Sequence, residues 1–193
     1  MEGSYDNKYK DMDNEESKLI ACLKEDSKKD IAFEKLVKTY QERLYHHIRK
    51  MVISHEDTDD ILQNTFIKVW KSIGNFRGDS SLYTWLYRIA TNETITFLNS
   101  KKKKNFLPVN DINDYLMDNL VTDPWFDGDA IQMKLQEAII KLPEKQRIVF
   151  NMKYFDEMKY DDMSKILNTS VGALKASYHH AVKKIEQYLK ESD

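Results

Sequence analysis

The sequence has few of the residues that interrupt helices or form cross-links. Its 193 residues include 5 glycines, 3 prolines and one cysteine, Cys22. A single cysteine excludes an internal disulfide and a cysteine-based zinc site, and it favours a reducing compartment. The scarcity of glycine and proline, together with few alternating β-branched runs, predicts an all-α protein. A chain of this length can bury the cores of one or two small domains.

Long apolar runs are also missing. No stretch approaches the roughly 18 apolar residues that a membrane-spanning helix needs, and the polar start does not read as a signal peptide. We therefore expect a cytoplasmic protein with no membrane insertion. The adjacent pair His179 and His180 could suggest a metal, but neighbouring residues on a helix point apart. We expect no metal site and no cofactor.

The formal net charge of −2 conceals a segregation of charge along the chain. Residues 31–104 carry 13 basic and 8 acidic side chains, and residues 131–193 carry 11 and 9. Residues 105–130 carry 6 acidic and no basic side chains, and they contain two of the three prolines. This pattern predicts two helical domains, at 18–104 and 131–193, joined by an acidic flexible linker at 105–130. Residues 1–17 are polar and aperiodic, and we predict a disordered tail.

The first predicted domain has helical hydrophobic spacing over about 18–50, 56–73 and 81–100. Between the last two helices, residues 74–81 have the composition of a loop, and Ser80 or Ser81 can cap the third helix. In the second domain, a short helix over about 160–167 is followed by a tight turn at Asn168. Ser170 then caps a long last helix. Short helix, turn and longer helix are typical of a helix-turn-helix.

Two helix faces carry unusual side chains. On the third helix, Trp85 lies next to a stripe of Arg88, Asn92 and Thr96, and four lysines follow at 101–104. Rings can stack on unpaired bases, while arginine and amides can bind base edges and phosphates. Ordinary packing and solvation explain the same residues equally well when each is taken alone. The last helix has a basic face of small residues that suits a major groove.

Two longer segments resemble a known family. The run DILQNTFIKVWKSIGNFRGDSSLYTWLYRIATNETITFL is similar to region 2 of the bacterial extracytoplasmic-function sigma factors, which belong to the sigma-70 family. The run LPEKQRIVFNMKYFDEMKYDDMSKILNTSVGALKASYHHAVKKI is similar to their region 4. The two segments occur in the family's order and at its separation. The resemblance implies a promoter-specificity subunit of RNA polymerase that is not itself an enzyme.

The resemblance also implies three sets of binding residues. Those that match the docking positions for the clamp helices of the largest polymerase subunit are Asp60, Gln63, Asn64 and Trp70. Those that match the positions binding the minus-ten element are Asn75, Phe76, Arg77, Asp79, Ser80, Trp85, Arg88, Asn92 and Thr96. Those that fall on the minus-thirty-five recognition helix, or at its start, are Ser170, Gly172, Lys175, Ser177, His179, His180 and Lys183.

The partners that the resemblance implies are core RNA polymerase, through its clamp helices and flap, promoter DNA and an anti-sigma factor. The acidic linker matches the segment that threads the polymerase's RNA channel. We expect a monomer outside the holoenzyme, with its two domains packed together so that the DNA-binding faces are buried. One departure from the family pattern is Lys159, which stands where a capping Ser or Thr usually begins the short helix.

Two other functions remain to be separated from this one. A conventional helix-turn-helix regulator would explain the last helix, but it leaves the face beside Trp85 and the acidic linker without a role. A nuclease would need metal ligands, and the carboxylates of Asp57, Asp59 and Asp60 crowd one helix start without partners at a recognisable metal spacing.

Overall fold

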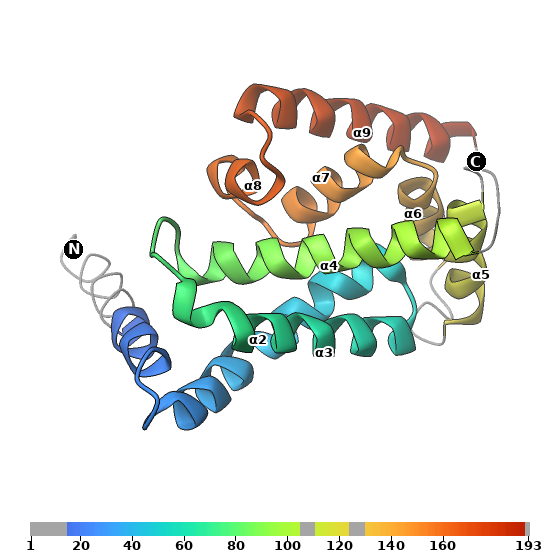
Figure 1. Ribbon diagram of the computed structural model, residues 1–193. Coiled ribbons are helices and arrows are strands. Elements are labelled where there is room, and N and C mark those ends of the chain that lie inside the picture. The colour runs from blue at the N-terminus through green and yellow to red at the C-terminus, as the bar shows by residue number, and fades with distance from the viewer. Residues whose placement is uncertain (1–14, 105–110, 124–129, 192–193) are drawn as a thin grey trace, which may run out of the picture.

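A computed structural model of the chain describes residues 15–104, 111–123 and 130–191. Every regular element within these ranges is helical, as Figure 1 shows, which confirms the predicted all-α class. Residues 15–23 form the first helix, so the tail predicted over 1–17 includes helical residues. The other elements of the first domain are α2 (Lys29–Val52), α3 (His55–Ser72), the short 3₁₀ helix η1 (Ile73–Asn75) and α4 (Leu82–Lys104).

Local side-chain chemistry sets the starts of α3 and α4. The Ser54 hydroxyl accepts a hydrogen bond from the Asp57 backbone N–H at 3.2 Å, and acidic residues occupy the first turn, where they favour the positive end of the helix dipole. At α4, the cap is Ser81, one of the two predicted candidates, whose hydroxyl accepts from the Thr84 N–H at 3.2 Å. The three helices then pack around fully buried residues that include Leu44, Ile48 and Leu86.

Part of the acidic connector is folded. Residues 111–122 form α5 (Asp111–Thr122), and Ile112, Leu116 and Leu120 repeat at intervals of four residues along its buried face. Asp114 and Asp118 lie on the exposed face of the same helix. These acidic charges, which predicted a flexible linker, lie on only one face of this helix. Helical spacing separates them from an apolar stripe that packs on the rest of the protein.

The second domain contains α6 (Ala130–Ile140), α7 (Glu144–Tyr154), α8 (Tyr160–Leu167) and α9 (Val171–Glu191). Asn168 ends α8 with φ 48°, in the left-handed region that asparagine tolerates better than most residues. The Ser170 hydroxyl then accepts from the Ala173 N–H at 3.3 Å and caps α9. Both details confirm the predicted helix-turn-helix.

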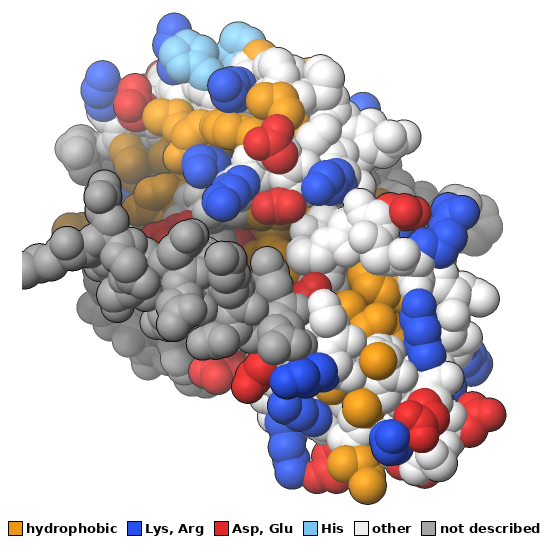
Figure 2. All heavy atoms as spheres, turned by 90° about the vertical axis from the view of Figure 1, so that its left-hand side faces the viewer, with side chains coloured by type: hydrophobic (Ala, Val, Ile, Leu, Met, Phe, Trp, Pro, Cys, Tyr) orange, Lys and Arg blue, Asp and Glu red, His pale blue; other side chains and the backbone are white. Residues whose placement is uncertain are grey.

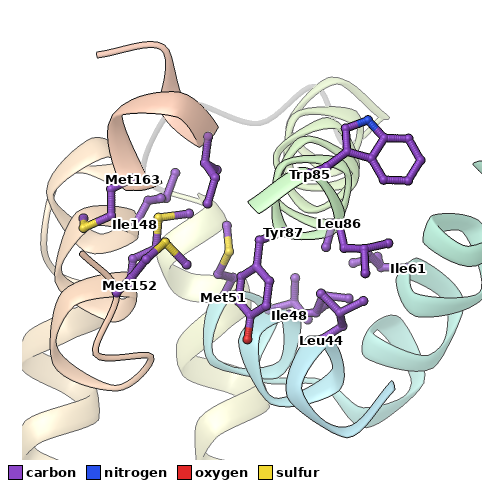
Figure 3. Packing of buried hydrophobic residues seen from close by; sticks show 14 of the residues in the cluster. Leu44, Ile48, Met51, Ile61, Trp85, Leu86, Tyr87, Ile148, Met152 and Met163 are labelled. Carbon is purple, nitrogen blue, oxygen red and sulfur yellow. The ribbon is translucent and has the colours of Figure 1, made fainter. Parts of the chain in front are cut away.

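The two domains pack against each other and share one apolar core. In Figure 1, α4 crosses the middle of the molecule, with α2 and α3 on one side and α7, α8 and α9 on the other. Figure 3 shows Tyr87 of α4 beside Met51 of α2, facing the helices that carry Met152 and Met163. Trp85 projects from the opposite side of α4. The two domains therefore pack together as predicted, and the exposure of single residues shows whether this packing covers the predicted DNA-binding faces.

Candidate nucleic-acid and protein-binding surfaces

The loop between η1 and α4 is held in place by an aromatic pair. Phe76 is 4% exposed and Trp85 is 9% exposed, and their ring centroids lie 5.1 Å apart. Gly78 has φ 81°, a backbone conformation that side chains other than glycine rarely adopt. The loop is therefore anchored by the buried Phe76 and makes a tight turn at Gly78, and both features fix the direction in which its polar residues project.

The two aromatic residues predicted to bind the minus-ten element pack on each other. Phe76 and Trp85 are both buried in this structure. The loop residues that reach solvent are Asn75, Arg77 and Asp79, with Ser80 half-buried. Arg77 and Asp79 form an ion pair at 3.4 Å that is almost fully exposed, so it adds little stability and leaves both side chains free to exchange partners.

The outer face of α4 carries the predicted polar stripe. Arg88, Asn92 and Thr96 are all exposed, and their spacing of four residues aligns them along one side of the helix. The Thr96 hydroxyl donates to the Asn92 backbone oxygen at 2.7 Å, so its lone pairs remain available to accept a hydrogen bond. An arginine, an amide and a hydroxyl in one row can bind phosphates and base edges.

The first lysine of the run at 101–104 has structural contacts. Lys101 lies 3.4 Å from an Asp57 carboxylate oxygen and over the rings of Phe97 and Tyr115. Tyr115 of α5 also donates its hydroxyl to the same carboxylate group. Lys101 therefore helps to hold α5 on the first domain. The side chains of 102–104 lie outside the part of the structure that is described in detail.

The outer face of α3 combines polar groups with one exposed aliphatic residue. Asp60, Gln63 and Asn64 are exposed, as predicted. Trp70 is half-buried, packs edge-on against Phe33 and has the Lys29 ammonium 4.1 Å above its ring. Such a face, polar with a partly exposed aromatic ring, is suited to docking another protein.

Sequence reasoning missed Ile67 on the same face of α3. Its side chain is 44% exposed, and it lies one helical turn after Gln63 on the same side of α3. The signal that could have found it is its position, because the apolar residues of α3 that face the core leave Ile67 outside their stripe.

The recognition helix presents most of its predicted residues to solvent. Gly172, Lys175, His179 and Lys183 follow one exposed side of α9, and His180 lies exposed at the flank of that side. Figure 2 shows histidine and basic side chains together at the top of the molecule, at the height of α9 in Figure 1.

Ser177 and Ser170 occupy other positions on this helix. Ser177 is half-buried, because it lies on the opposite side of α9 from Lys175. Ser170 is exposed at the cap, where its hydroxyl accepts the hydrogen bond that starts the helix. Ser177 is therefore poorly placed to contact DNA in this arrangement, whereas Ser170 stands at the end of α9 from which a groove-binding helix usually reads bases.

A buried polar cluster joins the two domains and was not predicted. His47 of α2 is 1% exposed, and its Nδ1 lies 2.6 Å from a carboxylate oxygen of Asp156, which follows α7. Its Nε2 lies 2.9 Å from the hydroxyl of Thr91. That hydroxyl donates its hydrogen to the Tyr87 backbone oxygen at 2.7 Å, so it accepts from His47. Both ring nitrogens therefore have a polar partner, a carboxylate on one side and a hydroxyl on the other.

The second carboxylate oxygen of Asp156 accepts from Lys50 Nζ at 3.1 Å. Burial alone would raise the pKa of Asp156, but the hydrogen bonds and charges of His47 and Lys50 outweigh it and hold that pKa below its ordinary value. A further contact between the domains runs from the Thr84 hydroxyl to Asp162 at 3.1 Å. We call His47, Lys50, Thr91 and Asp156 the interdomain cluster.

The packing of the domains does not bury the predicted DNA-binding faces, contrary to our expectation. Arg88, Asn92 and Thr96 on α4, and Lys175 and His179 on α9, are all exposed while the domains are in contact. The contact surface is formed instead by the opposite side of α4, where Tyr83, Thr84 and Tyr87 face α8 and α2. Packing of the two domains thus leaves these faces exposed, but it limits the distance between them.

Two other kinds of structural feature are absent from the described ranges. No group of three or more histidine, cysteine or carboxylate side chains is placed to hold a metal ion there. Of the helices described, none is both long and apolar enough to cross a bilayer.

Comparisons with known proteins agree with this geometry. Residues 36–104 match the family model for sigma-70 region 2, and residues 132–185 match the model for sigma-70 region 4. The ECF RNA polymerase sigma factor SigW of Bacillus subtilis is 30% identical over 168 residues, which cover 83% of this chain and 90% of that protein. The RNA polymerase sigma-H factor of Pseudomonas aeruginosa is 29% identical over 166 residues, covering 82% and 86%.

Two solved structures share the fold. The sigma factor RpoE of Bartonella quintana, in complex with the anti-sigma factor NepR, superposes with a TM-score of 0.67 at 18% identity, covering 82% of this chain and 96% of that one. CnrH, in complex with the cytosolic domain of CnrY, gives a TM-score of 0.66 at 21% identity, covering 92% and 99%.

Proposed function

Since the chain belongs to the sigma-70 family, as an extracytoplasmic-function RNA polymerase sigma factor, we propose that three of its surfaces divide the work of initiation. The outer face of α3 docks on the clamp helices of core polymerase. The loop before α4 and the outer stripe of α4 hold the opened minus-ten element. The exposed side of α9 binds the minus-thirty-five element as duplex, and the whole reaction takes place in the bacterial cytoplasm.

The exposed row of Arg88, Asn92 and Thr96 beside the anchored loop is the observation that carries the proposal. Separating a DNA duplex costs about 1.4 kcal/mol for each base step on average. A protein can offset this cost by holding an extruded base and by binding the single strand. Asn75, Arg77 and Asp79 project from the loop to hold the base, while the α4 row is placed to bind the strand that follows.

Phe76 and Trp85 have a supporting role in this proposal. Because their rings pack on each other and on the core, they set the position of the loop and leave the contacts with DNA to its polar residues. A rigid support of this kind lowers the entropy that the loop loses when it binds a base.

The packed arrangement must open for this function. The minus-ten and minus-thirty-five elements are about 25 base pairs apart, which corresponds to about 85 Å of duplex at 3.4 Å per base pair. A packed body of this chain length has a radius of gyration of about 16 Å. The faces of α4 and α9 therefore cannot reach both elements until the contacts of the interdomain cluster have broken.

We also propose that an anti-sigma protein binds this chain. Support comes from the structural neighbour RpoE, whose structure was solved with the anti-sigma factor NepR. The packed form described here leaves α3 and α4 partly exposed, so such a protein would add its own cover to the polymerase-docking face.

The polymerase-docking part of the proposal is tested by a pull-down with core polymerase. The double variant Asp60→Ala with Gln63→Ala is expected to lose retention, because it removes two of the polar groups on the α3 face. The matched control also removes one carboxylate and one amide, on the exposed surface of α2, as Glu42→Ala with Gln41→Ala. Equal retention of both double variants would contradict the assignment of α3.

The DNA-binding part is tested with reconstituted holoenzyme and a labelled non-template strand. The holoenzyme is expected to bind an unpaired minus-ten segment more tightly than the same segment annealed. Arg88→Ala should reduce this preference by about five- to 150-fold, which corresponds to about 1–3 kcal/mol for one good contact. Arg43→Ala, an exposed arginine on α2, is the control. No preference for the unpaired segment would refute the proposal.

A further inference from the structure

A cavity of about 270 Å³ lies between the two domains. Its walls come from the second half of α2 and the start of α3 on one side, and from α6 and the end of α7 on the other. The residues lining it are Tyr45, His46, Arg49, Lys50, Ile53, His55, Gln132, Gln136 and Phe155. Nothing in the proposed sigma function uses this cavity.

Flat rings and aliphatic groups form much of its surface. The rings of Tyr45 and His55 lie nearly parallel, 28° from coplanar with centroids 6.2 Å apart, and Tyr45 is also hydrogen-bonded to His55 Nδ1. Across the domain boundary, the Lys50 ammonium lies 5.0 Å from the centre of the Phe155 ring. Ile53, in the short connection between α2 and α3, is a buried aliphatic residue of the lining. Planar walls of this kind favour a planar ligand.

The charge of the lining has one sign. His46, Arg49, Lys50 and His55 are basic or can become so, and none of the nine lining residues is acidic. The carboxylates that pair with Arg49 and Lys50 belong to Asp123 and Asp156, which are not among the lining residues. A cavity with this lining attracts an anion and repels a cation.

Arg49 provides an independent indication of an anionic ligand. One of its terminal nitrogens, Nη1, is buried and has no hydrogen-bond acceptor among the described residues. Its other terminal nitrogen, Nη2, is paired with an Asp123 carboxylate oxygen, and burial lowers the pKa of the guanidinium. A buried donor without an acceptor costs roughly 1–3 kcal/mol, so a shift of the Arg49 side chain that brought Nη1 to an oxyanion in the cavity would be favourable.

We propose that this cavity is a binding site for a small planar organic anion, such as an aromatic carboxylate, and that its ligand holds the two domains together. The rings provide the planar surface and the basic groups bind the carboxylate. Because both domains contribute walls, the complete site exists only while they are packed. A ligand that binds the packed form alone shifts the equilibrium toward that form and away from the polymerase-bound one.

The first experiment measures binding to the full chain without polymerase or DNA, so its outcome does not depend on the sigma function. The probe is naphthalene-1-carboxylate, and its neutral analogue naphthalene-1-methanol is the control for shape. Titration calorimetry is expected to show binding of the carboxylate at least tenfold tighter than binding of the alcohol. Equal affinities, or no binding of the carboxylate, would overturn the proposal.

Two variants locate the site. Gln136→Trp places a large side chain on a wall of the cavity and should abolish binding, whereas Gln41→Trp makes the same change on the exposed surface of α2 and should leave it unchanged. His46→Gln removes one basic group from an exposed position and should weaken binding several-fold. Wild-type affinity in Gln136→Trp would show that the probe binds elsewhere, and this result would refute the assignment.

The second experiment tests the effect on the domains. With the carboxylate at saturation, the apparent dissociation constant for core polymerase should rise. The rise should equal the factor by which the ligand shifts the equilibrium toward the packed form. The alcohol at the same concentration should have no effect. If saturating carboxylate left polymerase binding unchanged, the ligand would not hold the domains together, and that part of the proposal would be wrong.

Discussion

The interdomain cluster gives a quantitative prediction for the balance between packed and open forms. In His47→Gln, the ring that bridges Asp156 and Thr91 is replaced by a neutral amide that can satisfy only part of the same hydrogen bonds. Removing one partner of a fully buried ion pair typically costs about 3–5 kcal/mol. Lys50 still compensates Asp156 and glutamine still donates one hydrogen bond, so we expect about 2–3 kcal/mol.

That loss should appear in the packing equilibrium and in polymerase binding. A change of 2–3 kcal/mol corresponds to a shift of roughly 30- to 150-fold toward the open form. If only the open form binds core polymerase, the apparent affinity rises by the same factor until the open form predominates. The variant should therefore bind polymerase more tightly, which is unusual for a substitution in a protein core.

The assay is energy transfer between dyes attached at Lys38→Cys on α2 and Lys190→Cys on α9, with Cys22→Ser as the background. Both labelling positions are exposed. Transfer should fall in His47→Gln, and unlabelled protein should show the matching gain in polymerase affinity. His46→Gln, the exposed neighbouring histidine, is the control and should leave the dye distance unchanged in the absence of ligand.

A double-mutant cycle with Asp156→Asn separates the pair from its surroundings. We expect a coupling free energy of at least 1 kcal/mol between His47 and Asp156, since the two groups are in contact and buried. A coupling close to zero, or unchanged energy transfer in both single variants, would refute the reasoning that this pair holds the domains together.

Three further predictions concern stability. Trp85→Ala should lower the free energy of unfolding by about 3–5 kcal/mol in urea titrations because the ring is buried against Phe76, and a loss under 1 kcal/mol would show that the ring is not structural. Lys159 starts α8 without a side-chain cap, so Lys159→Ser should raise that free energy by about 1 kcal/mol, and an unchanged urea midpoint would contradict this. Asp156 has a lowered pKa in the folded protein, so its contribution to the free energy of unfolding is fully present above its ordinary pKa of 3.8. That contribution is lost as the pH falls through the lower pKa of the folded protein. Thermal melts of Asp156→Asn at decreasing pH should therefore lack this part of the acid destabilisation.

The features that the sequence predicted correctly depend on neighbours along the chain. The starts of α4 and α9 follow from Ser81 and Ser170, which accept hydrogen bonds from residues three positions later. The turn at Asn168 depends on one residue and its backbone angles. The exposed rows on α3, α4 and α9 follow from helical periodicity, so these residues could be placed without knowledge of tertiary contacts.

The features that the sequence did not predict depend on distant contacts. His47 and Asp156 are 109 positions apart, and nothing in the local pattern of either residue indicates the other. Phe76 stands in a polar loop, where burial requires a partner that only the fold supplies. The apolar stripe of α5 was hidden by its aspartates, because a charge count gives no weight to the face on which each charge lies.

Burial of the apolar side of α5 stabilises the packed form of the protein. Leu116 and Leu120 have no exposed surface here, and the helix that carries them is tied to both halves of the molecule, to Asp57 through Tyr115 and to Arg147 through Asn113. A chain that straightened on its own would place these leucines in water. The free subunit therefore favours the packed form, and a macromolecule that offered these leucines a dry surface would shift the balance toward the stretched form.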